Sequence, residues 1–287
     1  MPKISIIIAN YNNGHFFRDC YNSLIAQTEK NWEAIVIDDC STDNSVEIIK
    51  NSIAEDSRFR FFKNEENIGY QKTLIKGIEH SESSIFGRLD PDDALTPKAI
   101  EIMTKAHEEN PNAGLIYSNF IICDENLNKI KVHKCTPITT QDYNFLNFDA
   151  TISHFATFKK KFYEQTTGID PFIKRAEDKD IYMKMCEIAP VKHIDEDLYL
   201  YRVHNGGLST NANAEKALFW HWVALIKMAE RRGVEIEDTF IKHYVPMRKY
   251  HLLEDKVRSL KNSRLLKLLY RLGIFKAYKY LYKNSPL

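Results

Sequence analysis

Carboxylates supply the most specific chemical signal in this sequence. Residues 88–93 read Arg-Leu-Asp-Pro-Asp-Asp, which places Asp90 and Asp92 two positions apart with Pro91 stiffening the turn between them. Two carboxylates at this spacing can face one hard divalent cation, which would take phosphate oxygens as further ligands. Taken alone, the segment is more simply explained as a solvated acidic turn before a helix.

A second acidic pair, Asp38 and Asp39, follows an apolar run. A strand-end aspartate accepts phosphoryl in receiver domains and haloacid-type phosphatases, but those sites need a lysine or hydroxyl residue at set later strand ends, and they do not explain residues 89–93. The chain contains neither a GxGxxG fingerprint nor a GxxxxGK[ST] loop, the usual phosphate-binding loops of α/β sheets. A metal held by carboxylates is therefore the remaining way to bind phosphates.

Two later segments carry candidate catalytic groups. Glu177 and Asp178 begin a helical pattern, where acids commonly serve only as partners of the helix dipole; the functional alternative is a general base held near the site. His204 ends the run Tyr-Arg-Val-His. A lone histidine is more often structural, although a neutral imidazole is a good partner for a divalent cation. His154 is a weaker candidate of the same kind.

The elements that position these groups follow an α/β pattern, in which short apolar runs alternate with helical patterns over the first hundred residues. Polar side chains come just after the strands, where open α/β sheets bind ligands. The side chains of residues 41–44 are expected to cap a helix, and Thr96-Pro97 is expected to begin another. The predicted strands are 4–9, 32–37, 58–62, 84–89 and 114–122, and the predicted helices are 15–26, 46–54, 69–80, 178–186 and 213–232.

Composition limits the class of protein. The chain has 287 residues with 44% apolar and 28% charged side chains, enough for a buried core. No run reaches the roughly 18 apolar residues of a membrane span, and the first strand begins after three residues, so we expect neither a span nor a signal peptide. Five cysteines without a CxxC pair indicate neither a zinc site nor a complete disulfide framework, and predict a cytoplasmic location.

Charge is distributed unevenly along the chain. Residues 256–287 contain nine Lys or Arg and no Asp or Glu, which leaves a net charge of −8 for residues 1–255 and argues against nucleic-acid binding. Cations alternate with Leu, Ile, Phe and Tyr over residues 264–283. Such a helix can lie in an anionic membrane interface, or it can dock on the acidic body or on the second subunit of a homodimer. The sequence favours neither alternative.

Taken together, these segments resemble the family 2 glycosyltransferases, enzymes of the GT-A fold. The resemblance covers residues 3 to about 210, and its specificity lies in the order and spacing of seven short motifs. The motifs are residues 5–12, 35–43, 67–69, 89–93, 168–170, 177–178 and 201–204.

The resemblance implies an α/β GT-A fold, with a Rossmann-like mixed sheet flanked by helices and a C-terminal helical extension. Residues 1–110 would form the nucleotide-sugar-binding half of the GT-A domain, and residues 111–210 the acceptor-binding half. Residues 211–287 would form a C-terminal helical region with the basic amphipathic tail.

The resemblance also implies roles at the donor nucleoside. Ala9 and Tyr11 would line the nucleoside pocket, and Asp39 would accept a hydrogen bond from the base, which is usually uracil in this family. Members commonly have an arginine that helps to hold the donor where this chain reads Thr-Leu-Ile at residues 73–75. We expect Lys72 to supply that positive charge instead.

The remaining implied roles concern the metal and the donor sugar. Asp90 and Asp92 fall on the DxD motif, with Asp92 the expected metal ligand and Asp90 close to ribose or metal, while Asp93 supports the turn. His204 falls where many members place a histidine near the metal and diphosphate. His154 lies in a segment that often borders the donor sugar.

Asp178 falls on the catalytic base of the family's Glu-Asp pair, beside Glu177. The implied reaction is inverting transfer of a sugar from a UDP-sugar to an acceptor hydroxyl with Mn²⁺ or Mg²⁺, on a saccharide or lipid-linked saccharide. Such chemistry fits bacterial surface polysaccharide assembly in the cytoplasm or at the inner face of the cell membrane, which residues 256–287 would contact. The alternatives are a non-catalytic nucleotide-sugar or carbohydrate binding protein of the same fold, and a nucleotidyltransferase.

Overall fold

The computed structural model describes residues 1–138, 151–204 and 213–274, and the chain divides into two compact units, Met1–Arg232 and Gly233–Leu287. Residues 142–148, which have no regular apolar pattern and which we expect to be irregular, lie outside the described residues, as does the end of the basic tail after residue 274. The C-terminal helical region predicted from residue 211 starts one helix before the boundary between the units. This helix, Ala214–Arg232, belongs to the first unit.

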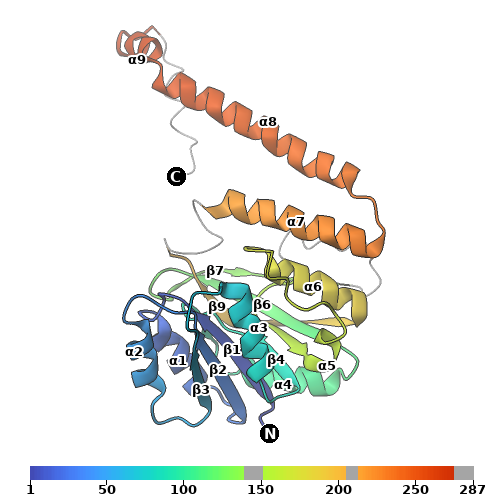
Figure 1. Ribbon diagram of the computed structural model, residues 1–287. Helices are drawn as coiled ribbons and strands as arrows, with labels where there is room; N and C mark the ends of the chain where they lie inside the picture. Colours follow the sequence, from blue (N-terminus) through green and yellow to red (C-terminus); the bar gives the residue numbers. More distant parts are fainter. Residues whose placement is uncertain (139–150, 205–212, 275–287) are drawn as a thin grey trace. The chain divides into compact units, whose positions relative to one another are not determined.

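A mixed sheet forms the centre of the first unit (Figure 1). Within the described residues it has nine strands, eight of them in the order β3-β2-β1-β4-β8-β6-β9-β5, with β7 paired to β6. Strands β3, β2, β1 and β4 run parallel, as expected for strands joined by crossover helices. The first strands are β1 (Ile4–Asn10), β2 (Trp32–Asp38), β3 (Phe59–Lys63) and β4 (Ile85–Arg88).

The burial of these strands explains why the sequence predicts them well. Every residue of β1 and β2 is buried, because helices cover both faces, so the strands are near-continuous apolar runs. The four predicted ranges agree with the observed bounds to within one residue at either end.

The second half of the sheet contains elements that the sequence did not predict. β8 is antiparallel to both β4 and β6, and it joins the two halves of the sheet. The predicted strand 114–122 is present as β6. The strands of this half are β5 (Ala94–Leu95), β6 (Leu115–Cys123), β7 (Lys129–His133), β8 (Ala156–Lys159) and β9 (Val191–Arg202).

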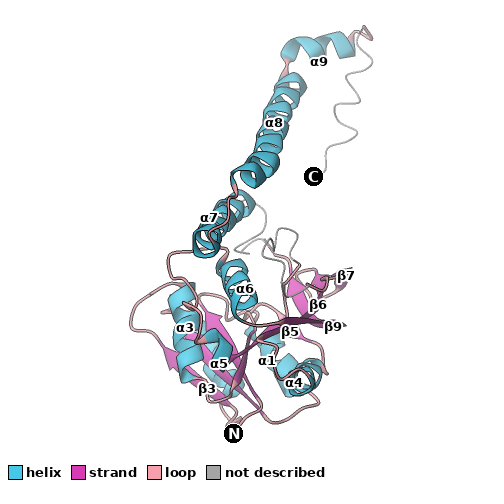
Figure 2. Cartoon of the chain, turned by 90° about the vertical axis from the view of Figure 1, so that its right-hand side faces the viewer, coloured by secondary structure: helices cyan, strands magenta, loops and turns pink. Residues whose placement is uncertain are grey.

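Helices cover both faces of the sheet. Figure 2 shows α3 and α5 on one face and α1 and α4 on the other. α3 packs on β1 and β2, and α6 packs on β6. The helices of the first unit are α1 (Phe17–Ile25), α2 (Ser45–Ile53), α3 (Tyr70–His80), α4 (Ala99–Glu109), α5 (Lys160–Tyr163), α6 (Glu177–Ile188) and α7 (Ala214–Arg232).

The expected helix start at Thr96-Pro97 is wrong. α4 begins at Ala99, because the backbone N–H of Thr96 donates to the carbonyl of Leu198 at 3.0 Å and prolongs the pairing of β5 with β9. Sheet pairing therefore takes the residue that would otherwise have capped the helix.

The expected capping by residues 41–44 is also wrong for most of these side chains. Asn44, the residue before α2, makes no side-chain capping bond, and the Ser41 hydroxyl donates to Asp38 at 2.5 Å. Thr42 pairs with Asn12. Only Asp43 accepts from a backbone N–H at the helix start, that of Ser45, at 2.9 Å. Ser41 and Thr42 instead fix the loop after β1 against the loop after β2.

The second unit contains two helices within its described part, α8 (Glu237–Asn262) and α9 (Arg264–Arg271). In α9 cations and leucines alternate at helical spacing, and Leu265 and Leu268 are exposed. Among the residues that the structure describes, no helix combines the length and the apolar character that crossing a membrane requires.

Candidate active site

Asp93 attaches the acidic turn after β4, residues 90–93, to strand β9. Its carboxylate is 1% exposed and accepts hydrogen bonds from the Tyr199 hydroxyl and from the backbone N–H of Arg202, both at 2.7 Å. The Tyr199 hydroxyl in turn accepts the N–H of Asp90 at 3.2 Å. Burial and the neighbouring charge of Asp92 raise the pKa of Asp93 well above its usual range. Asp93 therefore supports the turn and is not available to a ligand.

Asp92 pairs with His204. The Nε2 atom of His204 lies 2.8 Å from Oδ2 of Asp92, and the imidazole packs edge-on against Phe16. Burial and the charge of Asp90 raise the pKa of Asp92, while the contact with His204 opposes this. A carboxylate and an imidazole placed together in this way suit a divalent cation. The described residues contain no group of three such side chains, so a cation here would need ligand oxygens from a bound substrate.

Asp90 contacts two residues, Tyr70 and Arg88, whose part in the site the sequence analysis missed. The Tyr70 hydroxyl, from the first turn of α3, donates to Asp90 at 2.5 Å. The guanidinium of Arg88 lies 3.3 Å from the same carboxylate. Asp90 thus keeps a defined orientation beside Asp92.

Arg88 also joins the turn to helix α6. Its guanidinium contacts Glu177 at 3.1 Å, so one side chain bridges two acids that are 87 residues apart in sequence, Asp90 and Glu177. Burial and the adjacent Asp178 raise the pKa of Glu177 to about 7, although Arg88 acts in the opposite direction. Glu177 is buried and occupied by this pairing, whereas Asp178 is more accessible.

Asp178 lies in the first turn of α6 and borders a cavity together with Arg88, Glu177 and His154. The rest of the lining is mostly apolar and comes from α3, α6 and the central strands. The cavity volume of about 40 Å³ suits ordered water rather than a sugar ring. Asp178 therefore has room for a water-sized group on one side while it remains near the acidic turn through Arg88.

His154 is part of a stack of rings. It lies between Tyr199 and Tyr201, with ring centroids 4.8 and 5.4 Å away. Burial and the charge of Arg88 lower the pKa of His154 to about 4. The imidazole is thus neutral near pH 7 and packs as an aromatic ring rather than acting as a cation.

The predicted nucleoside residues lie at the ends of β1 and β2. Ala9 is buried, while the Tyr11 ring is 47% exposed. Asp39 is 3% exposed and accepts the backbone N–H groups of Ile68 and Gly69 at 3.0 and 2.9 Å, which ties the start of α3 to β2. Lys72 is exposed on α3, and among the described residues the guanidinium groups of Arg88 and Arg202 contact the acidic turn.

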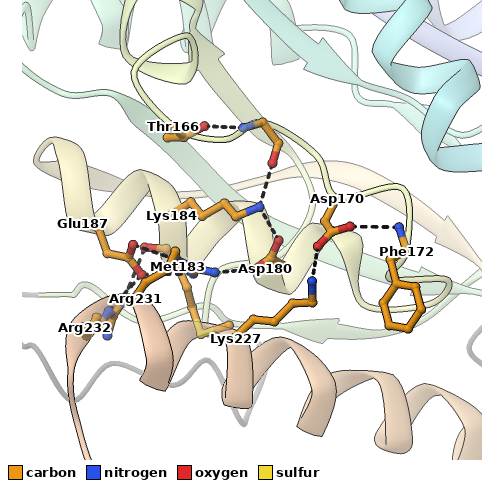
Figure 3. A network of polar contacts seen from close by, with 11 residues as sticks. Thr166, Asp170, Phe172, Asp180, Met183, Lys184, Glu187, Lys227, Arg231 and Arg232 are labelled. Carbon is orange, nitrogen blue, oxygen red and sulfur yellow. Dashed lines mark hydrogen bonds and ion pairs between the residues drawn. The ribbon is translucent and has the colours of Figure 1, made fainter.

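Helix α6 is fixed from its far side by α7. Asp180 is fully buried and contacts Lys184 at 2.7 Å and Arg231 at 3.2 Å (Figure 3). Arg231 and Arg232 both bind Glu187 in the last turn of α6. Because buried charges are costly to leave unpaired, this network specifies how α7 docks on the helix that carries Asp178.

A further pair in the same view fixes the loop before α6. Lys227 of α7 contacts Asp170 at 2.7 Å, and Lys184 donates to the carbonyl of Gly168 at 2.8 Å (Figure 3). The loop that leads to Asp178 is thereby attached to both helices.

Comparison with known proteins identifies the family to which the chain belongs. The model of the family described as Glycosyl transferase family 2 matches residues 5–167, more than half of the chain. The chain is 28% identical over 209 residues to a chondroitin synthase of Escherichia coli, covering 73% of this chain and 30% of that protein. It is 26% identical over 241 residues to a hyaluronan synthase of Pasteurella multocida, covering 82% and 24%. The chain thus spans less than a third of the length of these relatives.

Two solved structures share the fold. Residues 1–349 of Staphylococcus aureus TarS in complex with UDP-GlcNAc superpose with a TM-score of 0.63 at 18% identity, covering 80% of this chain and 67% of that one. The mannosyltransferase PcManGT of Pyrobaculum calidifontis, in complex with GDP-Man and Mn²⁺, gives 0.64 at 15%, covering 97% and 82%. The predicted GT-A fold is confirmed, and so is the family resemblance.

Proposed function

Because the chain belongs to glycosyl transferase family 2, we propose that it transfers a sugar from a UDP-sugar to an acceptor hydroxyl with inversion. The observation that carries this proposal is the bridge made by Arg88, which places the acidic turn and the start of α6 beside one another. Inverting transfer in one step requires a group that holds the leaving diphosphate and a base on the opposite face of the sugar. In this proposal the acidic turn holds the leaving diphosphate, and Asp178 is the base.

The donor would lie across the ends of β1, β2 and β4. The exposed ring of Tyr11 is available to stack on the base, next to Ala9, and Asp39 is held rigid beside it. Lys72, exposed on α3, is free of the sheet and can reach an anionic group. The complex of TarS with UDP-GlcNAc supports a uridine nucleotide, while that of PcManGT with GDP-Man makes guanosine the donor to compare.

The residues around the turn fit a divalent cation. Asp92 and His204, with Asp90 beside them, would hold Mn²⁺ or Mg²⁺ against the diphosphate. When bound, the cation supplies electrostatic stabilisation of the charge on the departing diphosphate. Burial and, after it, the charge of Asp90 raise the pKa of Asp92, and a bound cation would offset that negative charge.

Asp178 would act as the base. As the acceptor oxygen bonds to the anomeric carbon, the bond from that carbon to the diphosphate breaks, and Asp178 takes the hydroxyl proton. Asp178 suits this role better than Glu177, because Glu177 is buried against Arg88. General-base assistance of this kind contributes about 10²- to 10⁴-fold in rate.

The acceptor would be a saccharide or a lipid-linked saccharide. The chondroitin and hyaluronan synthases among the relatives support polysaccharide assembly as the context, with the reaction in the cytoplasm or at the inner membrane face. The acidic pair at Asp90 and Asp92 together with Asp178 argues against a binding protein without turnover. A nucleotidyltransferase would need a nucleoside triphosphate and a basic, glycine-rich loop near the N-terminus.

A panel of UDP-sugars and GDP-mannose, each with Mn²⁺ and without acceptor, tests this proposal. We expect one UDP-sugar to release UDP by slow hydrolysis, and we expect the release to stop in excess chelator. Release of pyrophosphate from a nucleoside triphosphate would identify a nucleotidyltransferase instead. Tight UDP binding with no release from any donor would identify a binding protein.

A further inference from the structure

A row of aromatic rings covers one face of the second half of the sheet. Phe120 on β6 pairs with His133 on β7, and their rings stack with centroids 4.7 Å apart. Phe120 also pairs with Tyr199 on β9, two residues before Tyr201. Side chains of directly paired residues, and of residues two apart in one strand, lie on the same face of a sheet. His154 lies among these rings, with its centroid 5.7 Å from that of Phe120.

This row begins at the candidate active site. The Tyr199 hydroxyl holds Asp93 and the N–H of Asp90. Burial and, after it, the charges of the acidic turn raise the pKa of the Tyr201 phenol above its usual range. His154 borders the cavity that Asp178 lines. The rings therefore run from the acidic turn and the base toward the edge strand β7.

Exposure increases along the row. Tyr199 is fully buried, and Phe120 is 7% exposed. Tyr201 and His133 are half-buried and so present part of their rings to solvent. Both carry a polar edge, a hydroxyl in one case and a ring nitrogen in the other. Flat aromatic faces with polar edges suit a ligand that has an apolar face and a polar rim.

We propose that Tyr201 and His133 form a stacking platform for a hexose ring of the acceptor saccharide, with Phe120 and His154 packed against them. The inference rests on the proposed transferase function and adds the acceptor site to it. A pyranose ring has one face of C–H groups and a rim of hydroxyls, which matches the rings and their polar edges. Continuity with Asp178 favours an acceptor, since the acceptor hydroxyl must reach that carboxylate.

Substitution of His133 and Tyr201 by alanine tests the platform. His80→Ala is the matched control. His80, the last residue of α3, also stacks on a phenylalanine, with its centroid 4.1 Å from that of Phe62 on the opposite edge strand β3. The acceptor probes are the p-nitrophenyl glycosides of glucose, galactose, N-acetylglucosamine and glucuronic acid. Transfer to each is measured with the donor that the wild-type protein hydrolyses.

We expect His133→Ala and Tyr201→Ala each to raise the KM for the glycoside by about tenfold, the size of a lost stacking contact, with the donor KM changed less than twofold. His133→Phe, which keeps the ring, should restore the acceptor KM, and His80→Ala should resemble wild type. A structural role would instead lower kcat and raise the donor KM together.

Two results would overturn the platform without affecting the transferase proposal. One is an unchanged acceptor KM in both alanine variants. The other is a wild-type protein that hydrolyses the donor but transfers to none of the four glycosides, since the platform is argued to accept a hexose ring whatever its substituents. Absence of donor hydrolysis from all nucleotide sugars would instead contradict the transferase function itself.

Discussion

Single residues divide the work of the proposed site according to their neighbours. Asp93 is committed to Tyr199 and Arg202, and Glu177 is committed to Arg88. Asp92 and Asp178 are the acids left with faces for a ligand. These four carboxylates form two adjacent pairs in the sequence, yet the members of each pair have different roles, because each has different hydrogen-bond donors around it.

Arg88→Lys tests whether the bridge between the turn and α6 matters for catalysis. A lysine carries a compact charge and cannot contact Asp90 and Glu177 at once in the way a guanidinium does. We expect kcat for UDP release to fall roughly 10- to 100-fold, the cost of one lost hydrogen bond to a charged group. Arg60→Lys is the control, since Arg60 similarly contacts two acids, Glu33 and Glu82. Wild-type kcat in Arg88→Lys would show that the bridge is only structural.

Asp92→Ala tests the metal assignment. We expect the variant to bind UDP more weakly, and Mn²⁺ should no longer strengthen the binding, because the carboxylate that pairs with His204 is lost. Titration calorimetry of UDP with and without Mn²⁺ measures both effects. Asp124→Ala, in the turn that closes the β6–β7 hairpin, should leave both the UDP affinity and its dependence on Mn²⁺ unchanged. Full activity of the wild-type protein in excess chelator would refute the metal assignment.

Much of the site could be predicted at this scale, but not how its parts meet. The spacing of Asp90 and Asp92 is a local property of the chain, so the sequence shows it directly. Tyr70 and Arg88 were missed, because a single tyrosine or arginine at an element end forms no pattern. Their importance depends on contacts with residues such as Glu177, and only the fold supplies these. Lys72 is a candidate from its position in the sequence, but only the structure shows that its side chain is exposed on α3.

At the scale of elements, predictability follows burial. β1 and β2 are buried on both faces and were predicted as apolar runs. β5 has two residues, and β7 carries exposed lysines, so neither has a strong apolar pattern. β8 is followed by a run of lysines that obscures its four buried residues. β5 and β8 are stabilised by pairing with strands distant in sequence, and β7 by its hairpin with β6, and a local apolar pattern contains none of this information.

The contact between α4 and β8 predicts a pH dependence of stability. Burial and the charge of Lys159 lower the pKa of His107 to about 3, and its Nε2 lies 2.9 Å from the hydroxyl of Thr157. Below about pH 6.5 His107 is protonated in the unfolded chain but not in the folded chain, which favours unfolding. The contribution of His107 to the free energy of unfolding is therefore complete above about pH 6.5 and decreases as the pH falls toward about 3.

His107→Gln removes this titration and keeps a hydrogen-bonding group. We expect the free energy of unfolding of the wild type, relative to the variant, to decrease by about 2 kcal/mol between pH 7 and pH 5. Urea unfolding at several pH values measures the difference. Parallel stability curves would show that His107 does not titrate in this way.

At the scale of the whole molecule, the second unit carries the unexplained basic tail. In α9, Leu265 and Leu268 are 64% and 53% exposed, and Arg264, Lys267 and Arg271 alternate with them at helical spacing. We expect the chain to float with vesicles that contain anionic lipid, because such a helix can lie in a charged interface.

The matched variants separate the alternatives for the tail. Leu265→Gln with Leu268→Gln should abolish flotation, and Leu252→Gln with Leu253→Gln, at exposed positions of α8, should not. If the wild-type chain stays at the bottom of the gradient with neutral vesicles and also with anionic vesicles, it does not bind lipid. That result would favour docking of the helix on protein.

The central claim is that Asp178 takes the acceptor proton while the turn of Asp90 and Asp92 holds the donor. Asp178→Asn keeps the shape of the side chain and removes its basicity, so it measures the two functions separately. We expect UDP binding with Mn²⁺ to remain within about twofold of wild type, while transfer to an acceptor falls at least about 100-fold. Transfer at the wild-type rate, or loss of UDP binding together with transfer, would contradict this assignment.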